Sequence, residues 1–153
     1  MAFLNTMNII GSGLTAQQLR LDIISENVTN SSTTRTENGG AYRRKLVVFE
    51  ANTGDVSFRE AMERAAKGQP VSRKGEPVGG VRVTNIAEDP SDFKLMYDPT
   101  HPDADDEGYV SLPNVDMVKE VTDAMAATQA YSSNVTVFNA VKSVIMRGLD
   151  IGK

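Results

Sequence analysis

The sequence contains no cysteine and only one histidine. The missing cysteines exclude disulfide bonds, thiolate metal sites and a cysteine nucleophile together, and they suit a protein that is exported through an oxidising space. No basic residue precedes Arg20, and no apolar core followed by a cleavage site stands near the start. We therefore expect no cleaved secretory signal peptide.

Charge is also scarce at both ends of the chain. Residues 1–34 contain three charged side chains, whereas residues 35–113 contain 25 and residues 114–153 contain eight. The net charge of −4 gives no reason to expect nucleic acid or an anionic membrane as a partner. With 40% hydrophobic and 24% charged residues, the composition is typical of one soluble, folded domain.

Residues 124–141 contain no charge at all. Their many Ser, Thr, Asn and Gln side chains make this segment too polar to span a bilayer. A surface helix of a monomer normally carries charges on its wet face, so we expect the segment to pack against protein on most sides. Burial inside its own domain is one explanation. Assembly with other chains is favoured, because only residues 35–113 remain to cover it.

The C-terminal end has the apolar spacing of one long helix, from Asn114 to about Leu149. Asn114 would be its N-cap, and Asp116 would place negative charge in the first turn. At 1.5 Å per residue the helix would be roughly 50 Å long, longer than a compact domain of this size is wide. The stripe that we interpret as a subunit interface consists of Met117, Val121, Met125, Tyr131, Val135, Phe138, Ile145 and Leu149.

The N-terminal end carries a second stripe, with the alternating spacings of four and three that form a heptad seam. Its residues are Phe3, Met7, Ile10, Leu14, Leu21, Ile24 and Val28, with Gln17 in the one gap. Two such stripes favour an antiparallel or coiled-coil-like helical pair whose apolar residues also contact other subunits. Because a lone pair buries little surface for the backbone that it must order, we predict that both helices are largely disordered in the monomer and fold on assembly.

The segment Gly11–Ala16 fits the dinucleotide-binding pattern GxGxxA. Such a site needs a preceding strand and an acidic residue that closes a second strand about 20 positions later. Here the heptad seam runs through the glycines, so a helix bend or a close helix contact is favoured.

The middle region predicts a small β domain. Strand patterns at 42–50, 81–86 and 93–97 indicate one small antiparallel sheet of three strands, with a short helical rhythm at 58–66 and a flexible segment within 51–80. The basic run Arg43–Lys45 could bind nucleic acid, or it could form a solvated or interface cluster. The negative net charge of the chain favours the cluster.

Residues 98–108 hold His101 and the densest acidic cluster. Asp103, Asp105 and Glu107 mimic early positions of a calcium loop, but Asn114 stands where the bidentate Glu would be. A histidine beside carboxylates also permits general-base chemistry, although no nucleophile accompanies it. A calcium-binding or His/Asp-dependent enzyme module is therefore the alternative function. The simpler interpretation is a rigid, extended path into the last helix.

Several motifs together resemble bacterial flagellar rod and hook proteins. The N-terminal motif runs from Gly11 to Asn30, and Glu26 and Thr29 depart from the family pattern. Further similarity lies at residues 42–45, 80–83, 88–91, 97–99, 101–110, 112–116 and 131–139. The run 101–110 is the most specific and resembles the proximal-rod branch of the family.

This resemblance implies a structural subunit, not an enzyme, that assembles helically in the proximal rod and transmits motor torque to the hook without a cofactor or metal. The apolar stripes and strand patterns predict an α+β fold, with long terminal helices packed as a coiled-coil-like pair that carries a small antiparallel β domain. The expected units are residues 1–34, 35–113 and 114–153. The implied partners are further copies, the rod proteins FlgB, FlgF and FlgG, the adaptor FliE and the flagellar type III export apparatus, which delivers the chain to the periplasm. Nucleic acid and direct membrane insertion are not expected.

Overall fold

The structure is a computed structural model that describes residues 2–37, 39–53, 58–67 and 77–151 of the 153-residue chain. The elements follow the order α1 (Ala2–Thr29), β1 (Lys45–Thr53), α2 (Phe58–Ala66), β2 (Pro77–Glu88), β3 (Lys94–Tyr97), β4 (Tyr109–Leu112) and α3 (Met117–Ile151). The α+β class is therefore confirmed, and so are the short helix at 58–66 and the two long terminal helices.

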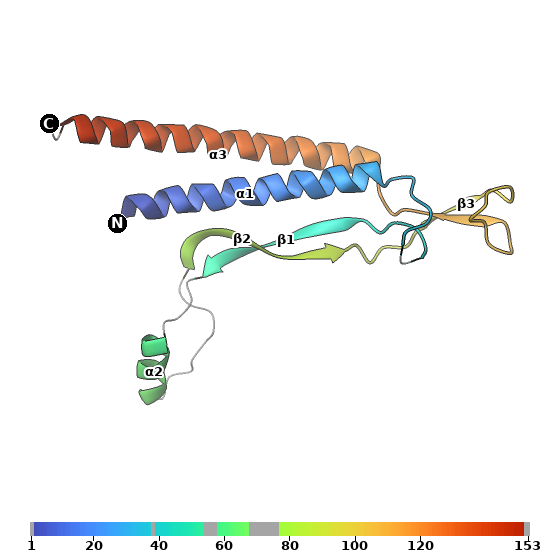
Figure 1. The fold of residues 1–153 in the computed structure, drawn as a ribbon, viewed down its shortest axis with the longest axis horizontal. Helices are drawn as coiled ribbons and strands as arrows, with labels where there is room; N and C mark the ends of the chain where they lie inside the picture. Colours follow the sequence, from blue (N-terminus) through green and yellow to red (C-terminus); the bar gives the residue numbers. More distant parts are fainter. Residues whose placement is uncertain (1, 38, 54–57, 68–76, 152–153) are drawn as a thin grey trace.

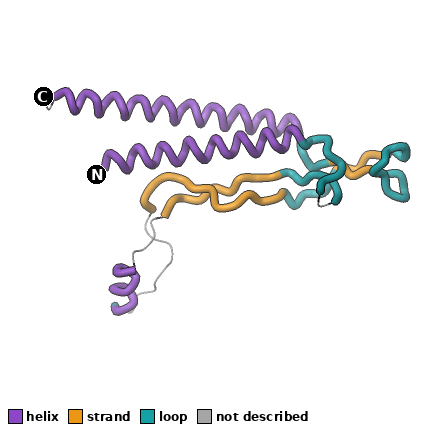
Figure 2. The backbone as a smooth tube through the Cα atoms, in the orientation of Figure 1, coloured by secondary structure: helices purple, strands orange, loops and turns teal. Residues whose placement is uncertain are grey.

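The long helices α1 and α3 lie side by side and run antiparallel, so both chain termini lie at one end of the molecule (Figure 1). The β1–β2 hairpin packs along α1 on the side away from α3, which gives three layers (Figures 1 and 2). The hairpin approaches α1 closely at Gly79 and Gly80, whose φ angles are +90° and +93°. A Cβ at Gly80 would lie 2.6 Å from Ser12 Oγ, and that hydroxyl accepts a hydrogen bond from the Val81 amide.

The strands form two two-stranded antiparallel sheets instead of the single three-stranded sheet expected. β1 pairs with β2 from Lys45↔Glu88 to Thr53↔Pro77, with register shifts after Val48 and Ala51. β3 pairs with β4 from Lys94↔Leu112 to Tyr97↔Tyr109. The expectation was wrong because residues 109–112, for which we predicted no strand, form one and pair with β3. The β3–β4 ribbon projects beyond the end of the helical pair that is remote from the termini (Figure 1).

α3 begins at Met117, and Asp116 is its N-cap. Asp116 Oδ1 accepts hydrogen bonds from the amides of Val118 at 3.0 Å and Lys119 at 3.5 Å. The prediction of Asn114 as the N-cap was therefore wrong. Of the predicted flexible segment, residues 51–53 and 77–80 belong to β1 and β2, whereas residues 54–57 and 68–76 lie outside the described part of the chain.

Few side chains are buried in this elongated molecule. The buried apolar residues among those described are Ile10, Ala16, Ile23, Ile24, Ala41, Tyr42, Val110, Val115 and Ala127. α1 is continuous through both of its predicted motif glycines, so the strand that a dinucleotide site needs does not precede them. A Cβ at Gly13 would lie 3.1 Å from Asn134 Nδ2 of α3, which confirms the predicted close helix contact for this glycine.

Candidate assembly surface and the junction behind it

The end of α1 and the start of α3 are joined by a buried polar junction, which we define as Asn27, Arg44, Asp89, Glu120 and Asp123. Asn27, 1% exposed, uses all four hydrogen-bonding positions of its amide. Its Nδ2 donates to the Lys45 carbonyl at 2.9 Å and to Glu120 Oε2 at 3.1 Å. Its Oδ1 accepts from the Lys45 amide at 2.9 Å and from the Tyr42 hydroxyl at 3.0 Å. One side chain of α1 therefore connects β1 to α3.

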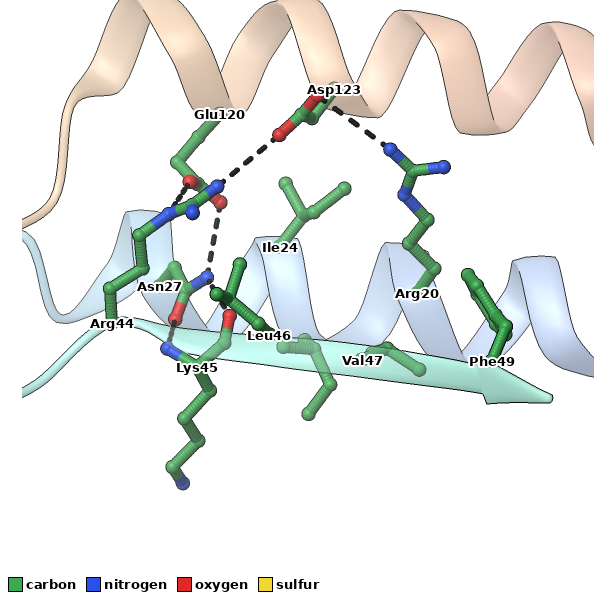
Figure 3. A pocket seen from close by; sticks show the side chains of 11 residues that line it. Arg20, Ile24, Asn27, Arg44, Lys45, Leu46, Val47, Phe49, Glu120 and Asp123 are labelled. Atoms are coloured by element: carbon green, nitrogen blue, oxygen red, sulfur yellow. Dashed lines mark hydrogen bonds and ion pairs between the residues drawn. The ribbon is translucent and has the colours of Figure 1, made fainter. Parts of the chain in front are cut away.

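Arg44 forms the centre of the junction (Figure 3). Its Nε donates to Glu120 Oε1 at 2.6 Å, its Nη2 to Asp123 Oδ2 at 3.2 Å and its Nη1 to Asp89 Oδ2 at 3.5 Å. The Arg44 side chain is 7% exposed and that of Glu120 is 0% exposed. The interpretation of residues 43–45 as a solvated or interface cluster was therefore wrong for Arg44, because its three carboxylate partners come from this same chain.

The environment of the junction shifts three pKa values. Burial disfavours the charged form of Arg44, but hydrogen bonding and attraction from Glu120, with Asp89 and Asp123, outweigh it and raise the pKa of Arg44 above its usual value. Burial, followed by the charges of Glu26 and Glu120, raises the pKa of Tyr42 from 10.0 to about 12. Hydrogen bonds from the Ser91 amide and hydroxyl, followed by Arg44, lower the pKa of Asp89.

Asn114 braces the outer side of the junction instead of capping α3. Its Oδ1 accepts from the Arg44 amide at 2.8 Å, and its Nδ2 donates to the Ser91 hydroxyl at 2.9 Å. Arg43 donates to the carbonyls of Asp89 and Ser91 at 2.9 Å and 3.0 Å and lies over the Phe93 ring at 4.4 Å. The turn after β2 is therefore fixed to both β1 and the entry of α3.

Sequence patterns alone indicate little about these junction residues. Glu120 and Asp123 lie 76 and 79 positions after Arg44, so no local pattern links them. One sequence feature was available: Glu120, Ala124, Ala127 and Tyr131 follow the spacing of four and three, which places a carboxylate on the inward stripe of α3.

A cavity of about 250 Å³ adjoins the junction between α1, α3 and β1 (Figure 3). Its walls combine Ile23, Ile24, Val47 and Phe49 with the side chains of the junction. Four charged groups on this wall pair with one another, in the ion pairs of Arg44 with Glu120 and Asp123 and in the contact of Arg20 with Asp123 at 3.6 Å. The fifth, Lys45, pairs with Glu26 outside the wall. Such mutual pairing suits a structural role, in which the charges fix how helices and hairpin meet.

The acidic segment 98–108 forms turns with its side chains. Asp105 Oδ1 accepts from the amides of Glu107 and Tyr109, and the Asp103 amide donates to His101 Nδ1 at 3.1 Å. Asp103 also accepts from Thr34 at 2.8 Å and pairs with Arg35 at 3.6 Å. Within the described ranges, no group of three or more His, Asp or Glu side chains is arranged to hold a metal ion.

The predicted interface stripes are only partly covered by the chain itself. In α1, Ile10 and Ile24 are buried, whereas Met7, Leu14, Leu21 and Val28 are half-buried. In α3, Met117, Val121 and Met125 are exposed, whereas Tyr131, Val135, Phe138 and Ile145 are half-buried. The side chains of Phe3 and Leu149 lie outside what the structure describes.

A further set of exposed residues follows one side of α3 away from α1, and we name it the outer face. The outer face consists of Val118, Met125, Gln129, Ser133, Val137, Ala140 and Val144. Val118, Met125, Val137 and Val144 are between 50% and 76% exposed. None of the outer-face residues is charged, and the exposed cations Lys119 and Arg147 lie on this side of α3 only near its two ends. Among the described helices, none combines the length and the apolar character that crossing a membrane requires.

Comparisons with known proteins agree over the whole chain. Residues 7–35 match the family described as flagella basal body rod protein, and residues 106–151 match the C-terminal family of the flagellar basal body rod FlgEFG proteins. Relatives called flagellar basal-body rod protein FlgC include those of Bacillus subtilis, 43% identical over 100% of both chains, and of Borreliella burgdorferi, 39% identical over 99% of this chain and 98% of the relative. The FlgC of Escherichia coli O157:H7 is 37% identical over 100% of both chains. The chain therefore belongs to the FlgC family of flagellar basal-body rod proteins, and it is a structural protein, not an enzyme.

Proposed function

We propose that this structural subunit of the basal-body rod builds the wall of the proximal rod with its two terminal helices and transmits motor torque to the hook. The observation that carries this proposal is the outer face of α3, which is exposed in the single chain and yet contains no charge. A helix face in permanent contact with water normally carries charged residues. An exposed face without them is suited to burial against a neighbouring subunit.

The layered fold supports different roles for the two terminal segments and for the middle region. We assign residues 1–34 and 114–153 to the wall and residues 35–113 to its outer side, because 25 of the charged residues lie in this middle region. The proposed contacts between subunits use the half-buried seam of α1, the stripe of α3 and the outer face. A subunit with different neighbours on different sides makes heterologous contacts, which generate a helical array. Torque transmission then rests on the stiffness of close-packed helices.

The proposed partners follow from family membership. They are further copies of the chain, the rod proteins FlgB, FlgF and FlgG and the adaptor FliE, assembled in the periplasmic part of the basal body. We propose export by the flagellar type III apparatus without a cleaved signal peptide. Shallow packing supports this route, because helices with few buried residues unfold readily before passage through a narrow channel.

The test introduces one charge into the outer face. Val137 is 50% exposed and lies in the uncharged run, so Val137→Glu should leave the fold of the single chain intact but place an unpaired carboxylate in the proposed interface. In a flagellated host whose own copy is deleted, we expect loss of swimming and of isolated rods. The thermal midpoint of the purified chain should stay within a few degrees of the parent.

Two controls accompany this variant. Val137→Ala removes the same side chain without adding charge and should retain motility. Asn85→Glu adds the same charge at an exposed position of β2, outside the proposed wall, and should also retain it. Normal rods and normal swimming with Val137→Glu would contradict the proposed function.

A further inference from the structure

The β1–β2 hairpin is held to α1 at two separate places. Near the end of α1, the Lys45 backbone exchanges two hydrogen bonds with the Asn27 side chain. Near the start of α1, the Val81 amide of β2 donates to Ser12 Oγ at 3.1 Å, where β2 curves toward the helix (Figure 1). We name this second contact the clasp and define it as Ser12 with Gly79, Gly80 and Val81. The clasp lies at the end of the hairpin that is remote from the junction.

On the hairpin side, the clasp has room only for glycine. Gly79 and Gly80 have φ angles of +90° and +93°, a backbone conformation that L side chains rarely adopt. A Cβ at Gly79 would lie 2.7 Å from Ile9 Cδ1, and one at Gly80 would lie 2.6 Å from Ser12 Oγ. The backbone of β2 therefore lies directly against Ile9 and Ser12 of α1.

On the helix side, the clasp depends on the helical conformation of α1. Ser12 Oγ donates its own proton to the Ile9 carbonyl at 2.7 Å, and this bond orients the hydroxyl oxygen so that it can accept from the Val81 amide. Ile9 and Ser12 face β2 together because residues three apart lie on the same side of a helix. An unwound segment 9–12 could not present both contacts to the hairpin.

The helix is intrinsically weak at this point. Gly11 and Gly13 flank Ser12, and glycine inside a helix is less favourable than alanine. The first turn of α1 has no acidic residue to stabilise its start. Gly13 lies against Asn134, but a Cβ at Gly11 would meet nothing within 4 Å. Gly11 therefore weakens the helix beside the clasp although packing does not require it.

We propose that the clasp closes the hairpin onto α1 only while residues 9–12 are helical, so that folding of the N-terminal half of α1 fixes the hairpin. Among residues 4–12, Ile10 alone is buried by the chain itself. In the monomer this segment unwinds readily and the clasp opens with it. In the rod, neighbouring subunits keep the segment helical and the clasp closes. The inference rests on the proposed rod function and adds that assembly of the wall is transmitted to the hairpin of the same subunit.

Hydrogen exchange at the Val81 amide tests the coupling, because its single N–H donates to Ser12 Oγ. Exchange at this amide, measured at single-residue resolution by mass spectrometry, should be about tenfold slower in assembled rods than in the monomer, as one hydrogen bond of ordinary strength requires. Ser12→Ala should abolish the slowing. As a matched control, Thr15→Ala removes a hydroxyl that bonds to the Gly11 carbonyl within α1 and should leave the slowing unchanged.

A second variant should close the clasp without assembly. Gly11→Ala strengthens the helix at a position where the added methyl group meets no neighbour. In the monomer it should slow exchange at the Val81 amide about two- to fivefold, which corresponds to the difference between glycine and alanine in a helix. G11A/S12A should show no slowing, because the helix is strengthened but the acceptor is missing. Circular dichroism checks that each variant is folded like the parent.

A third pair of variants tests the close fit. Gly80→Ala would place a methyl group against Ser12 Oγ, whereas Gly40 has a similar φ of +81° and a Cβ there would meet nothing within 4 Å. Both changes impose the same kind of backbone strain, but only the first obstructs the clasp. Rods of Gly80→Ala should exchange at the Val81 amide as fast as those of Ser12→Ala, and rods of Gly40→Ala should match the parent.

Three results would overturn the inference. They are equally slow exchange at Val81 in the monomer and in the rod, equally fast exchange in both, and slowing by Gly11→Ala that persists without the Ser12 hydroxyl. None of these results touches the proposed function, which fails separately if Val137→Glu assembles normally.

Discussion

At the scale of single residues, we expect substitutions in the buried junction to cost the most stability. Arg44→Leu leaves the carboxylate of Glu120, which is 0% exposed, with Asn27 as its one described hydrogen-bond partner. Because a buried charge without its partner is strongly unfavourable, we expect the free energy of unfolding to fall by about 3–5 kcal/mol. Urea denaturation of the purified chain measures this change.

Two further variants separate the pair from general effects of losing an arginine. R44L/E120L removes both charges and should be more stable than Arg44→Leu alone. Arg82→Leu breaks an Arg–Glu pair whose side chains are 49% and 33% exposed, so it should cost less than about 1 kcal/mol. Equal losses for Arg44→Leu and Arg82→Leu would show that burial of the junction does not matter for stability.

Tyr42 makes the junction sensitive to alkali. Its pKa is about 12 in the folded chain and 10.0 when exposed. A raised folded pKa gives stability that is complete below pH 10 and is lost as the pH rises toward 12. Between pH 9 and pH 11 the parent should therefore lose about 1.4 kcal/mol more free energy of unfolding than Tyr42→Phe. Parallel slopes for the two proteins over this range would contradict the assigned role of the hydroxyl.

At the scale of elements, apolar spacing predicted the helices and strands that depend on local sequence pattern. The long helices and the short helix follow from it, and so do the cores of β1, β2 and β3, because each repeats its own period along the chain. β4 was missed as a strand, since four residues after an acidic loop carry too little pattern to identify their partner. The three-stranded sheet was wrong for that reason.

The start of α3 shows a second limit. Asn114 and Asp116 are both good N-cap residues. A contact between residues far apart in the sequence decides which of them caps the helix. The Asn114 side chain accepts from the Arg44 amide 70 positions away, which leaves Asp116 to cap the helix. The junction is the hardest part to predict, because pairing between residues that far apart leaves no periodic pattern in the sequence. The stripes of α1 and α3, by contrast, could be identified as apolar without knowing which of their residues meet the partner helix.

At the scale of the whole molecule, burial falls steeply from the junction toward the termini. Asn27 and Glu120 are 1% and 0% exposed, but after Ala127 no described side chain of α3 is buried. A helix that packs this loosely gains little from its neighbours within the chain, and the cost of ordering its backbone is not offset. We therefore expect the distal halves of both helices to form stably only when other subunits cover them.

Hydrogen exchange measures this gradient amide by amide. In the purified monomer, residues 20–27 and 117–127 should be protected by their attachment to the junction, whereas residues 4–12 and 128–150 should exchange quickly. The assembled rod should protect the whole of both helices, because neighbouring subunits then bury the seam and the outer face. Val137→Glu is the matched control, since its monomer should exchange like the parent while no protected assembly forms. Strong protection along both entire helices in the monomer would mean that the pair is stable alone, and folding on assembly would have to be abandoned.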